Sequence, residues 1–502
     1  MRMRKNRFMK KDNIFPITVK DLEELLNSKF ENNPDLSISK FENKGKKALI
    51  FYIDYQVQGN MMEEYLLTPL LEKDMKWNNS TILNEIPLSN GKTLQSLDEI
   101  LTDLLIGGVF IYVEGEDSVI GYLLLKKEKR SLEQSETESV VLGPKIGFTE
   151  SLVTNLNIVR WTIRSKDLVL ESFLVGELEP REVRLIYLKS VANETDINTM
   201  KQRISELEID VVDDSSVLMQ YLEDSTSTIF PQFLTTELPD RFSYSINRGR
   251  IGVLVENSPT AFIAPTTFFS FFESTEDLYM RWNIGTILRA LRFISFILST
   301  IMTPLYVAAV TFHYEIIPIP LLINLGQSRA GVPFTPIVEV LILEFIIELL
   351  RESGARLPTK IGQTIGIVGG VVVGTAAVEA GITSNVLIIF VALSALASFS
   401  APNYLMGTAA RAIRFPMIIL GGVLGMVGLA FGLCFLVIHL LKITSLGRPY
   451  LSPVYPLRFQ DFNKALFRLP PQFENKRFKS YRPKELIRYS REKAKQKKDI
   501  DE

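Results

Sequence analysis

The chain has 502 residues, of which 46% are hydrophobic and 23% charged, and its formal net charge is −1. Two or three domains fit this length, and the near-zero charge excludes the broad basic face by which many proteins bind nucleic acid. The single cysteine, Cys434, excludes a disulfide within the chain and a cysteine-based metal site. Charged residues are frequent up to Arg292, scarce from Phe293 to Leu441 and frequent again afterwards, which predicts a soluble half, a membrane half and a basic tail.

The soluble half is predicted to be α/β and to consist of two small subdomains, residues 1–141 and 142–282. Basic residues 1–11 are followed by polar ones rather than by an apolar signal core, so we expect this half to stay in the cytoplasm. Short apolar runs predict strands at Ala48–Tyr55, Val109–Val113, Val119–Leu125, Leu168–Val175 and Val183–Leu188. Amphipathic patterns predict helices at Val19–Leu26, Met61–Leu71, Leu94–Leu105, Glu150–Ile163, Glu194–Leu207 and Ser216–Glu223.

The sequence of the soluble half gives no reason to expect an enzyme. It has no phosphate-binding glycine loop, no dinucleotide fingerprint and no pair of histidines. Asp210, Asp213 and Asp214 are close enough in sequence to suggest a cation site, but a helix cap in a solvated loop explains them better. We therefore expect no catalytic residue, no metal and no cofactor.

The membrane half, residues 283–441, is predicted to be all-α, with four stretches long and apolar enough to span: Phe293–Phe312, Ile361–Ala380, Asn385–Leu405 and Phe415–Leu441. Arg281, Arg289 and Arg292 before the first stretch, and the basic tail of residues 442–502, place both ends in the cytoplasm by the positive-inside rule. Two cytoplasmic ends need an even number of crossings, which four supply. The short loops conflict with this count, because it leaves several basic residues outside: Arg351, Arg356, Lys360, Arg411 and Arg414.

Residues 336–350 have the pattern of a strong amphipathic helix, but Glu339, Glu344 and Glu348 interrupt its apolar surface. Carboxylates facing lipid would be costly, so they must face water, a partner helix or the interface. In one interpretation the helix lies in the interface or packs on the bundle, with its glutamates paired to Arg351 and Arg356. In the other, copies of the helix from several subunits place a ring of carboxylates near a cation pathway.

Glycines recur at the spacing of one helix face in two of the apolar stretches. Without side chains, such faces let another helix approach at backbone contact, as in the small-xxx-small mode of membrane helices. The glycines could pack within one subunit, or between identical subunits around an axis, with Val371, Val372, Val373 and Thr375 near a narrow pore. The two faces consist of Gly362, Gly366, Gly370 and Gly374, and of Gly421, Gly425, Gly428 and Gly432.

Several motifs in register resemble the A subunits of GerA-family spore germination receptors, a family that also includes SpoVAF-type proteins. The resemblance is densest from Phe230 to Gly381. Its motifs are Phe230-Pro231-Gln232, Thr236-Glu237-Leu238-Pro239-Asp240, Gly249-Arg250, Glu273-Ser274-Thr275-Glu276-Asp277, Ser328-Arg329, Val332-Pro333-Phe334, Glu348-Leu349-Leu350-Arg351-Glu352, Arg356-Leu357-Pro358 and Ile367-Val368-Gly369-Gly370. Three positions depart from the family pattern, since Leu238 replaces the usual arginine, Lys145 replaces another, and Glu379 replaces an uncharged residue.

The resemblance implies a multi-pass receptor subunit in the inner membrane of a dormant bacterial spore. It implies homo-oligomers among membrane lipids, a multi-span B subunit that binds the nutrient, and a lipoprotein C subunit. We expect the membrane half to oligomerise as the ion-conducting part of a nutrient-responsive assembly that triggers germination. The alternative is a non-conducting scaffold or signal relay in the same complex.

Overall fold

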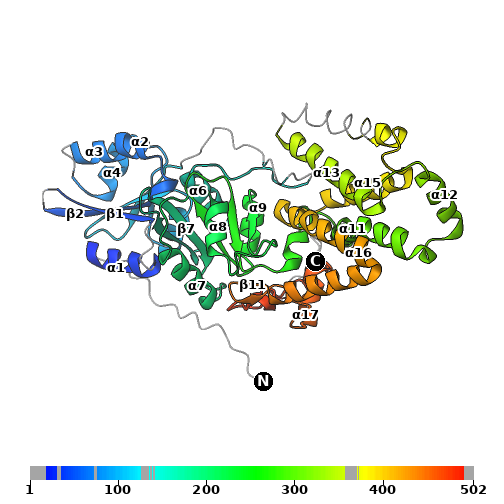
Figure 1. Cartoon of the computed structure of the whole chain (residues 1–502). Helices are drawn as coiled ribbons and strands as arrows, with labels where there is room; N and C mark the ends of the chain where they lie inside the picture. Colours follow the sequence, from blue (N-terminus) through cyan, green and yellow to red (C-terminus); the bar gives the residue numbers. More distant parts are fainter. Residues whose placement is uncertain are drawn as a thin grey trace, which may run out of the picture. The chain divides into compact units, whose positions relative to one another are not determined.

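The computed structural model describes residues 18–30, 35–43, 45–72, 76–125, 135, 138, 142–356, 370, 372 and 374–490 (Figure 1). The chain divides into two compact units. The α/β unit takes in Met1–Ser135, Lys145–Leu218 and Thr236–Ile263, and the helical unit takes in Glu136–Pro144, Met219–Thr235 and Ala264–Glu502. Two sheets in the first half and apolar helices in the second confirm the predicted fold class.

The first sheet has the strand order β1-β2-β4-β5-β3, and its neighbouring strands are antiparallel. All six residues of β4 are buried, as expected for a continuous apolar run at the centre of a sheet. Its strands are β1 (Leu36–Asn43), β2 (Lys46–Ile53), β3 (Lys92–Leu94), β4 (Gly108–Val113) and β5 (Val119–Leu123). The helices of this part are α1 (Val19–Phe30), α2 (Gly59–Met62), the π-helix Glu63–Leu67, α3 (Thr68–Glu72), α4 (Asn79–Glu85) and α5 (Leu97–Leu104).

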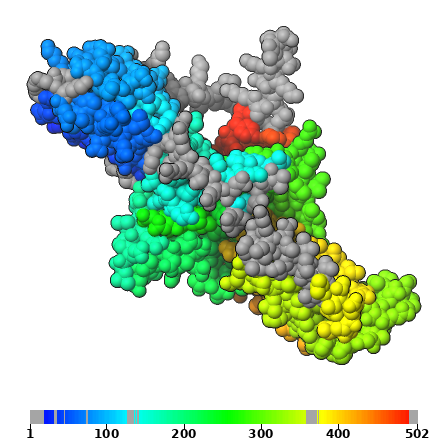
Figure 2. Space-filling view, turned by 90° about the horizontal axis from the view of Figure 1, so that it is seen from above, coloured from blue at the N-terminus to red at the C-terminus, as the bar shows by residue number. Residues whose placement is uncertain are grey.

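The second sheet has the order β6-β7-β9-β10-β8, and β7 is antiparallel to both of its neighbours. Figure 2 shows the first part of the α/β unit, in blue, and the cyan-to-green residues of the second part as adjoining lobes. Its strands are β6 (Leu168–Val175), β7 (Arg181–Leu188), β8 (Leu234–Thr236), β9 (Ile251–Val255) and β10 (Ala261–Ala264). Its helices are α6 (Leu152–Thr162), α7 (Glu194–Ser205), α8 (Ser215–Leu222) and α9 (Pro239–Ile246).

A buried polar network ties the two lobes of the α/β unit together. The Asp35 carboxylate, beside β1, lies 2.7 Å from Arg184 Nη1 of β7 and accepts a hydrogen bond of 3.3 Å from the Tyr55 hydroxyl. Arg160 of α6, only 1% exposed, donates from Nε to the same hydroxyl at 3.1 Å. Burial raises the pKa of Tyr55 to about 12, so its hydroxyl remains a hydrogen-bond donor at neutral pH.

The amino end of α8 is capped by Asp214. Its carboxylate accepts hydrogen bonds from the Ser216 amide at 2.8 Å and from the Ser258 hydroxyl. Burial raises the pKa of Asp214, but the hydrogen bonds from Ser216 and Ser258 outweigh burial and hold the pKa below its ordinary value of 3.8. The structure thus gives Asp214 the capping role expected for this loop.

We expect the cap to stabilise α8 at neutral pH and to fail in acid. Because the folded pKa lies below the unfolded one, the stabilisation is present above about pH 4 and is lost as the pH falls below 3.8. Asp214→Ala should cost about 1 kcal/mol at pH 7, measured by amide hydrogen exchange of α8 in the full chain. The control is Asp210→Ala, whose exposed side chain caps nothing. A difference between wild type and Asp214→Ala that persists unchanged at pH 3 would contradict this account.

The helical unit is built mainly from long apolar helices. Among the described residues, α11 and α16 are long and apolar enough to cross a membrane. Its helices are α10 (Glu276–Tyr279), α11 (Trp282–Phe312), α12 (Ile319–Arg329), α13 (Pro336–Ala355), α15 (Asn385–Phe399), α16 (Tyr404–Lys442) and α17 (Phe459–Ala465), and residues 374–379 are also helical. The short elements are β11 (Thr444–Ser445), β12 (Arg448–Pro449) and 3₁₀ helices at Phe268–Phe272, Tyr314–Ile316, Pro471–Phe473 and Lys479–Tyr481.

Side-chain contacts fix the relative directions of the bundle helices. Ser394 of α15 donates to the Ser299 carbonyl of α11 at 3.2 Å, and Ser384 lies 3.4 Å from the Tyr306 hydroxyl, so these two helices are antiparallel. Glu339 contacts Ser384, and Arg351 contacts Ser398 further along both helices, so α13 and α15 are parallel.

The predicted span Asn385–Leu405 is shorter in the structure. Helix α15 ends at Phe399, before Pro402, and Leu405 already belongs to α16.

Helix α16 folds back on itself at Gly425. This glycine has φ 62° and ψ −143°, which is not helical and which glycine adopts without a steric penalty. On either side of it, Gly421 lies against Leu429, Gly428 against Leu420 and Gly432 against Met417, so that the two halves pack as an antiparallel hairpin (Figure 1). The structure thus corrects the single continuous span predicted over Phe415–Leu441. The sequence could not show this, because glycines at this spacing also suit two short helices in close contact.

Candidate functional site

Three of the four glutamates of α13, Glu339, Glu344 and Glu348, each contact an arginine of the bundle. Glu339 lies at the beginning of the helix and is 1% exposed. Its Oε2 lies 2.6 Å from Nη1 of Arg329 on α12, and its Oε1 accepts hydrogen bonds from the Ser384 amide at 2.7 Å and the Thr383 hydroxyl at 3.1 Å. The carboxylate therefore joins α12 and α13 to the capped amino end of α15.

Glu344 and Arg414 form the most buried of these pairs. Their charged atoms, Oε2 and Nη1, are 2.5 Å apart, and both side chains are 3% exposed. Arg414 also donates from Nε to the Ser299 carbonyl of α11 at 2.7 Å. One arginine thus links α11, α13 and the first half of α16.

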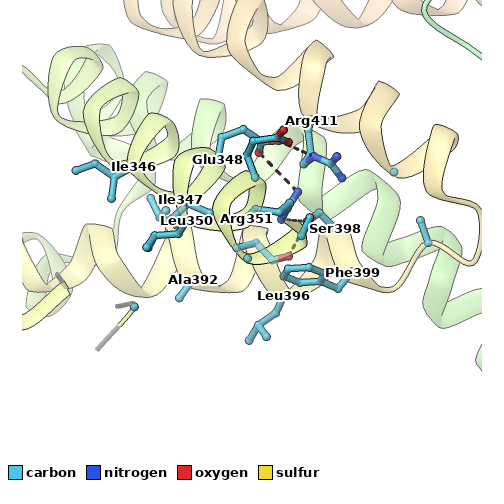
Figure 3. Close-up of a pocket in the computed structure, with 18 of the residues that line it drawn as sticks. Ile346, Ile347, Glu348, Leu350, Arg351, Ala392, Leu396, Ser398, Phe399 and Arg411 are labelled. Carbon is cyan, nitrogen blue, oxygen red and sulfur yellow. Dashed lines mark hydrogen bonds and ion pairs between the residues drawn. The ribbon is translucent and has the colours of Figure 1, made fainter. Parts of the chain in front are cut away.

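Glu348 is shared between two arginines at the far end of α13. Its Oε1 lies 3.2 Å from Arg411 Nε on α16, and its Oε2 lies 3.6 Å from Nη1 of Arg351 (Figure 3). Because Glu344 and Glu348 face Arg414 and Arg411 in reverse order, α13 runs antiparallel to the first half of α16. Arg351 further donates to the Ser398 hydroxyl at 2.8 Å and lies over the Phe399 ring.

These contacts support the interpretation in which the helix packs on the bundle with its glutamates paired to arginines. Most of the arginines, however, differ from the two that were predicted. Arg351 does contact Glu348, as expected, whereas Arg356 binds Glu352 at 2.5 Å in an exposed pair. The main partners of the three glutamates come from distant segments, α12 and α16. A single sequence gives no signal for such pairings beyond equal numbers of acidic and basic residues in apolar surroundings.

The first glycine face is only partly within the described residues. Gly362, Gly366 and Val371 lie outside them. Gly370 and Gly374 are described, and a Cβ atom built on either one meets no atom within 4 Å. Val372 is 55% exposed, and Thr375 donates to the Val372 carbonyl at 3.2 Å. In a single copy of the chain, the described part of this face thus has room for another helix.

The second glycine face is occupied within one copy. A Cβ on Gly421 would lie 2.8 Å from the Pro304 carbonyl of α11, and one on Gly428 would clash with the Leu420 carbonyl. Gly425 makes the turn of the hairpin and borders the ring of His313. These glycines therefore serve packing within the subunit, which was one of the two interpretations of the sequence.

The residues of the family motifs are mostly structural in their contacts. Gln232 is fully buried and binds Ser225 through its side-chain amide, and the Pro231 carbonyl accepts from the Tyr450 hydroxyl at 2.7 Å. Glu237 accepts from the Ser135 hydroxyl at 2.6 Å. Three further members lie in or beside α9, where Pro239 is its first residue, Asp240 follows in its first turn, and Arg250 is buried just before β9.

A buried charge cluster at the amino end of α11 escaped the sequence analysis. Asp277 of α10 is fully buried and lies 2.8 Å from Arg292 Nη1 and 3.4 Å from Arg289 Nη2. Arg468, from the tail, donates to the carbonyls of Leu278 and Met280 at 3.1 and 2.9 Å. The only signal was the spacing of 12 and 15 residues from Asp277 to two arginines, which also fits a basic flank of a membrane span.

Within the described residues, two helices are long and apolar enough to cross a membrane, and charged side chains of the helical unit pair with one another. A model of the family described as Bacillus/Clostridium GerA spore germination protein matches residues 24–480, and the chain belongs to this family. It is 40% identical to spore germination protein GerQA of Bacillus cereus over 96% of both chains. It is 36% identical to spore germination protein KA of Bacillus subtilis (strain 168), over 88% of this chain and 82% of that one.

Two further matches are a protein described as a membrane protein and a solved structure of a single domain. The uncharacterized membrane protein YfkQ of Bacillus subtilis (strain 168) is 32% identical, over 88% of this chain and 86% of its own. The crystal structure of the N-terminal domain of the A subunit of the Bacillus megaterium spore germinant receptor GerK3 is 27% identical and has a TM-score of 0.40. It covers 50% of this chain and 96% of that one. None of these four names describes an enzyme.

Proposed function

We propose that this chain is the A subunit of a nutrient-responsive spore germination receptor and that its membrane half oligomerises as the ion-conducting part. Membership of the GerA family over residues 24–480 carries the receptor role. By this proposal the chain acts in the inner membrane of the spore with a nutrient-binding B subunit and a lipoprotein C subunit. The alternative is a scaffold or relay that passes the state of the B subunit on without conducting ions.

The hairpin at Gly425 supports a topology with six crossings. If α11 runs outward from the cytoplasm, α15 runs inward because it is antiparallel to α11, and α13 runs inward because it is parallel to α15. The two halves of α16 then run outward and back. The predicted span Ile361–Ala380 supplies the outward crossing between α13 and α15. Arg351, Arg356, Arg411 and the basic tail then all lie on the cytoplasmic side, which removes the conflict that four crossings create.

The open part of the first glycine face supports oligomerisation. Gly370 and Gly374 are spaced by one helical turn, and no described atom of the same copy lies within 4 Å of a Cβ built on either one. Close helix contact in membranes needs such small residues. Glu339, Glu344 and Glu348 remain candidate ion contacts only if their arginines release them, so we assign the pore first to Val371, Val372 and Thr375.

Gly374→Leu should abolish assembly and the nutrient response. The leucine occupies the space where a second helix would approach, while its Cβ meets no described atom of its own copy within 4 Å. Oligomeric state in mild detergent and nutrient-triggered ion release from spores are the measurements. Gly326→Leu on α12 is the matched control, since that glycine also has no neighbouring atom within 4 Å. A normal oligomer and a normal response in Gly374→Leu spores would refute the proposed packing.

Cation flux through liposomes that contain the purified chain separates the two functions. Flux from stable oligomers supports conduction. Stable oligomers without flux, in the presence of the partner subunits and nutrient, support the scaffold.

A further inference from the structure

A cavity of about 1040 Å³ opens beside the carboxyl end of α13. Its walls come from α13, α15 and the beginning of α16, and it borders Gly370 and Gly374, so a molecule bound in it would lie beside the face assigned above to oligomer contact. Most of the lining is aliphatic or aromatic, including Ile347, Ala392 and Leu396 (Figure 3). A cavity of this size in apolar helices has the volume of several aliphatic side chains and suits hydrocarbon better than water.

Charged side chains gather at one end of this cavity. Figure 3 shows Arg351 and Arg411 on either side of Glu348, which is the carboxylate that both guanidinium groups contact. The other acidic residue of the lining, Glu352, is neutralised by Arg356. Arg356 does not line the cavity, but with it this group has three guanidinium groups and two carboxylates, and so a net charge of +1.

The hydrogen bonds of the two arginines are also incomplete. Among the residues that the structure describes, Arg351 Nε and Nη1 have no hydrogen-bond partner, and Nη1 has only the 3.6 Å approach to Glu348. Arg411 uses Nε for Glu348 and Nη2 for Thr408, which leaves Nη1 available. Buried guanidinium donors without acceptors are unfavourable, and a phosphate oxygen satisfies such donors with charge-assisted hydrogen bonds.

We propose that this cavity binds an anionic phospholipid, with its phosphate on Arg351 and Arg411 and an acyl chain along the apolar wall. The inference rests on the membrane topology proposed above. In that topology the carboxyl ends of α13 and α15 and the beginning of α16 lie at the cytoplasmic face. Headgroup phosphates of the inner leaflet lie at that depth, and a neighbouring acyl chain has direct access to the aliphatic lining.

The test is native mass spectrometry of the full chain purified in a neutral detergent. It compares retention of phosphatidylglycerol, phosphatidylcholine and soluble glycerol 3-phosphate. We expect phosphatidylglycerol to be retained preferentially and Arg351→Gln to weaken its binding about tenfold, the effect of losing one charge-assisted contact. Arg281→Gln, at an exposed arginine that does not line the cavity, is the control and should bind as wild type does. Ala392→Trp fills the cavity without changing any charge and should also reduce retention.

Equal retention of the two lipids overturns the proposal, as does a response of Arg351→Gln that matches that of Arg281→Gln. Full competition by glycerol 3-phosphate overturns it as well, because the ligand would then be a free phosphate ester. If Arg351→Gln does not fold, the test rests on Ala392→Trp. Reduced retention of phosphatidylglycerol by that variant supports the proposal, and retention equal to wild type overturns it. A chain that stays dispersed without detergent refutes the membrane topology itself, whereas a membrane-bound chain without lipid preference refutes only the lipid site.

Discussion

Gly428→Ala will lower the stability of the helical unit by about 3 kcal/mol, the upper range for overpacking a close contact. The added methyl group meets the Leu420 carbonyl across the hairpin, and backbone cannot move aside as a flexible side chain can. The gain in helix propensity on replacing glycine, about 1 kcal/mol, is too small to compensate. A drop in the thermal unfolding midpoint of the full chain in detergent measures the effect.

Gly326→Ala is the control for this change. It makes the same substitution within a helix at a position with open space, so its midpoint should stay the same or rise. If Gly428→Ala unfolds at the wild-type temperature, the two halves of α16 do not pack at backbone contact, and the six-crossing topology loses its basis.

Arg414→Met will destabilise the helical unit by about 3–5 kcal/mol, the usual cost of removing one partner of a buried ion pair. Glu344 would be left buried without its cation, since both side chains are 3% exposed and Arg414 is the partner at 2.5 Å. The Ser299 carbonyl would lose its charged donor at the same time. The fall in unfolding midpoint, or the loss of folded chain on expression, is the measurement.

The double variant Arg414→Met/Glu344→Leu should recover most of this loss, because an apolar pair of similar volume leaves no buried charge. Arg356→Met, which breaks the exposed pair with Glu352, should cost less than about 1 kcal/mol. A double variant no better than Arg414→Met alone would mean that the arginine acts mainly through α11 and not through Glu344.

The local elements of the soluble half could be predicted because each has its own period along the chain. The predicted strands at Leu168–Val175 and Val183–Leu188 appear as β6 and β7, and the helix predicted at Glu194–Leu207 appears as α7. Strand β1 was missed because Leu36–Asn43 alternates weakly and contains two lysine or glutamate side chains. β9 and β10 were missed because their short apolar runs carry little periodicity.

The candidate site was less predictable because it depends on contacts between distant segments. The glutamates of α13 stood out in an apolar helix, but nothing local pointed from Glu339 to Arg329 or from Glu344 to Arg414. The glycine spacing predicted close helix contacts, but it could not distinguish a straight helix from the hairpin at Gly425. A buried carboxylate must have a cationic partner and a glycine face must have a close neighbour, and both needs can be predicted from the residue types. Which residue meets each need depends on the fold.

The charge cluster around Asp277 limits how α11 can move. Arg289 and Arg292 of that helix bind Asp277, while Arg468 of the tail holds the carbonyls of Leu278 and Met280. If α11 shifts along its axis or rotates, it must therefore either carry this stretch of the tail with it as one rigid piece or break several buried ion contacts at once. Any signal that displaces the base of α11 is thereby transmitted to the carboxyl-terminal segment without a separate hinge.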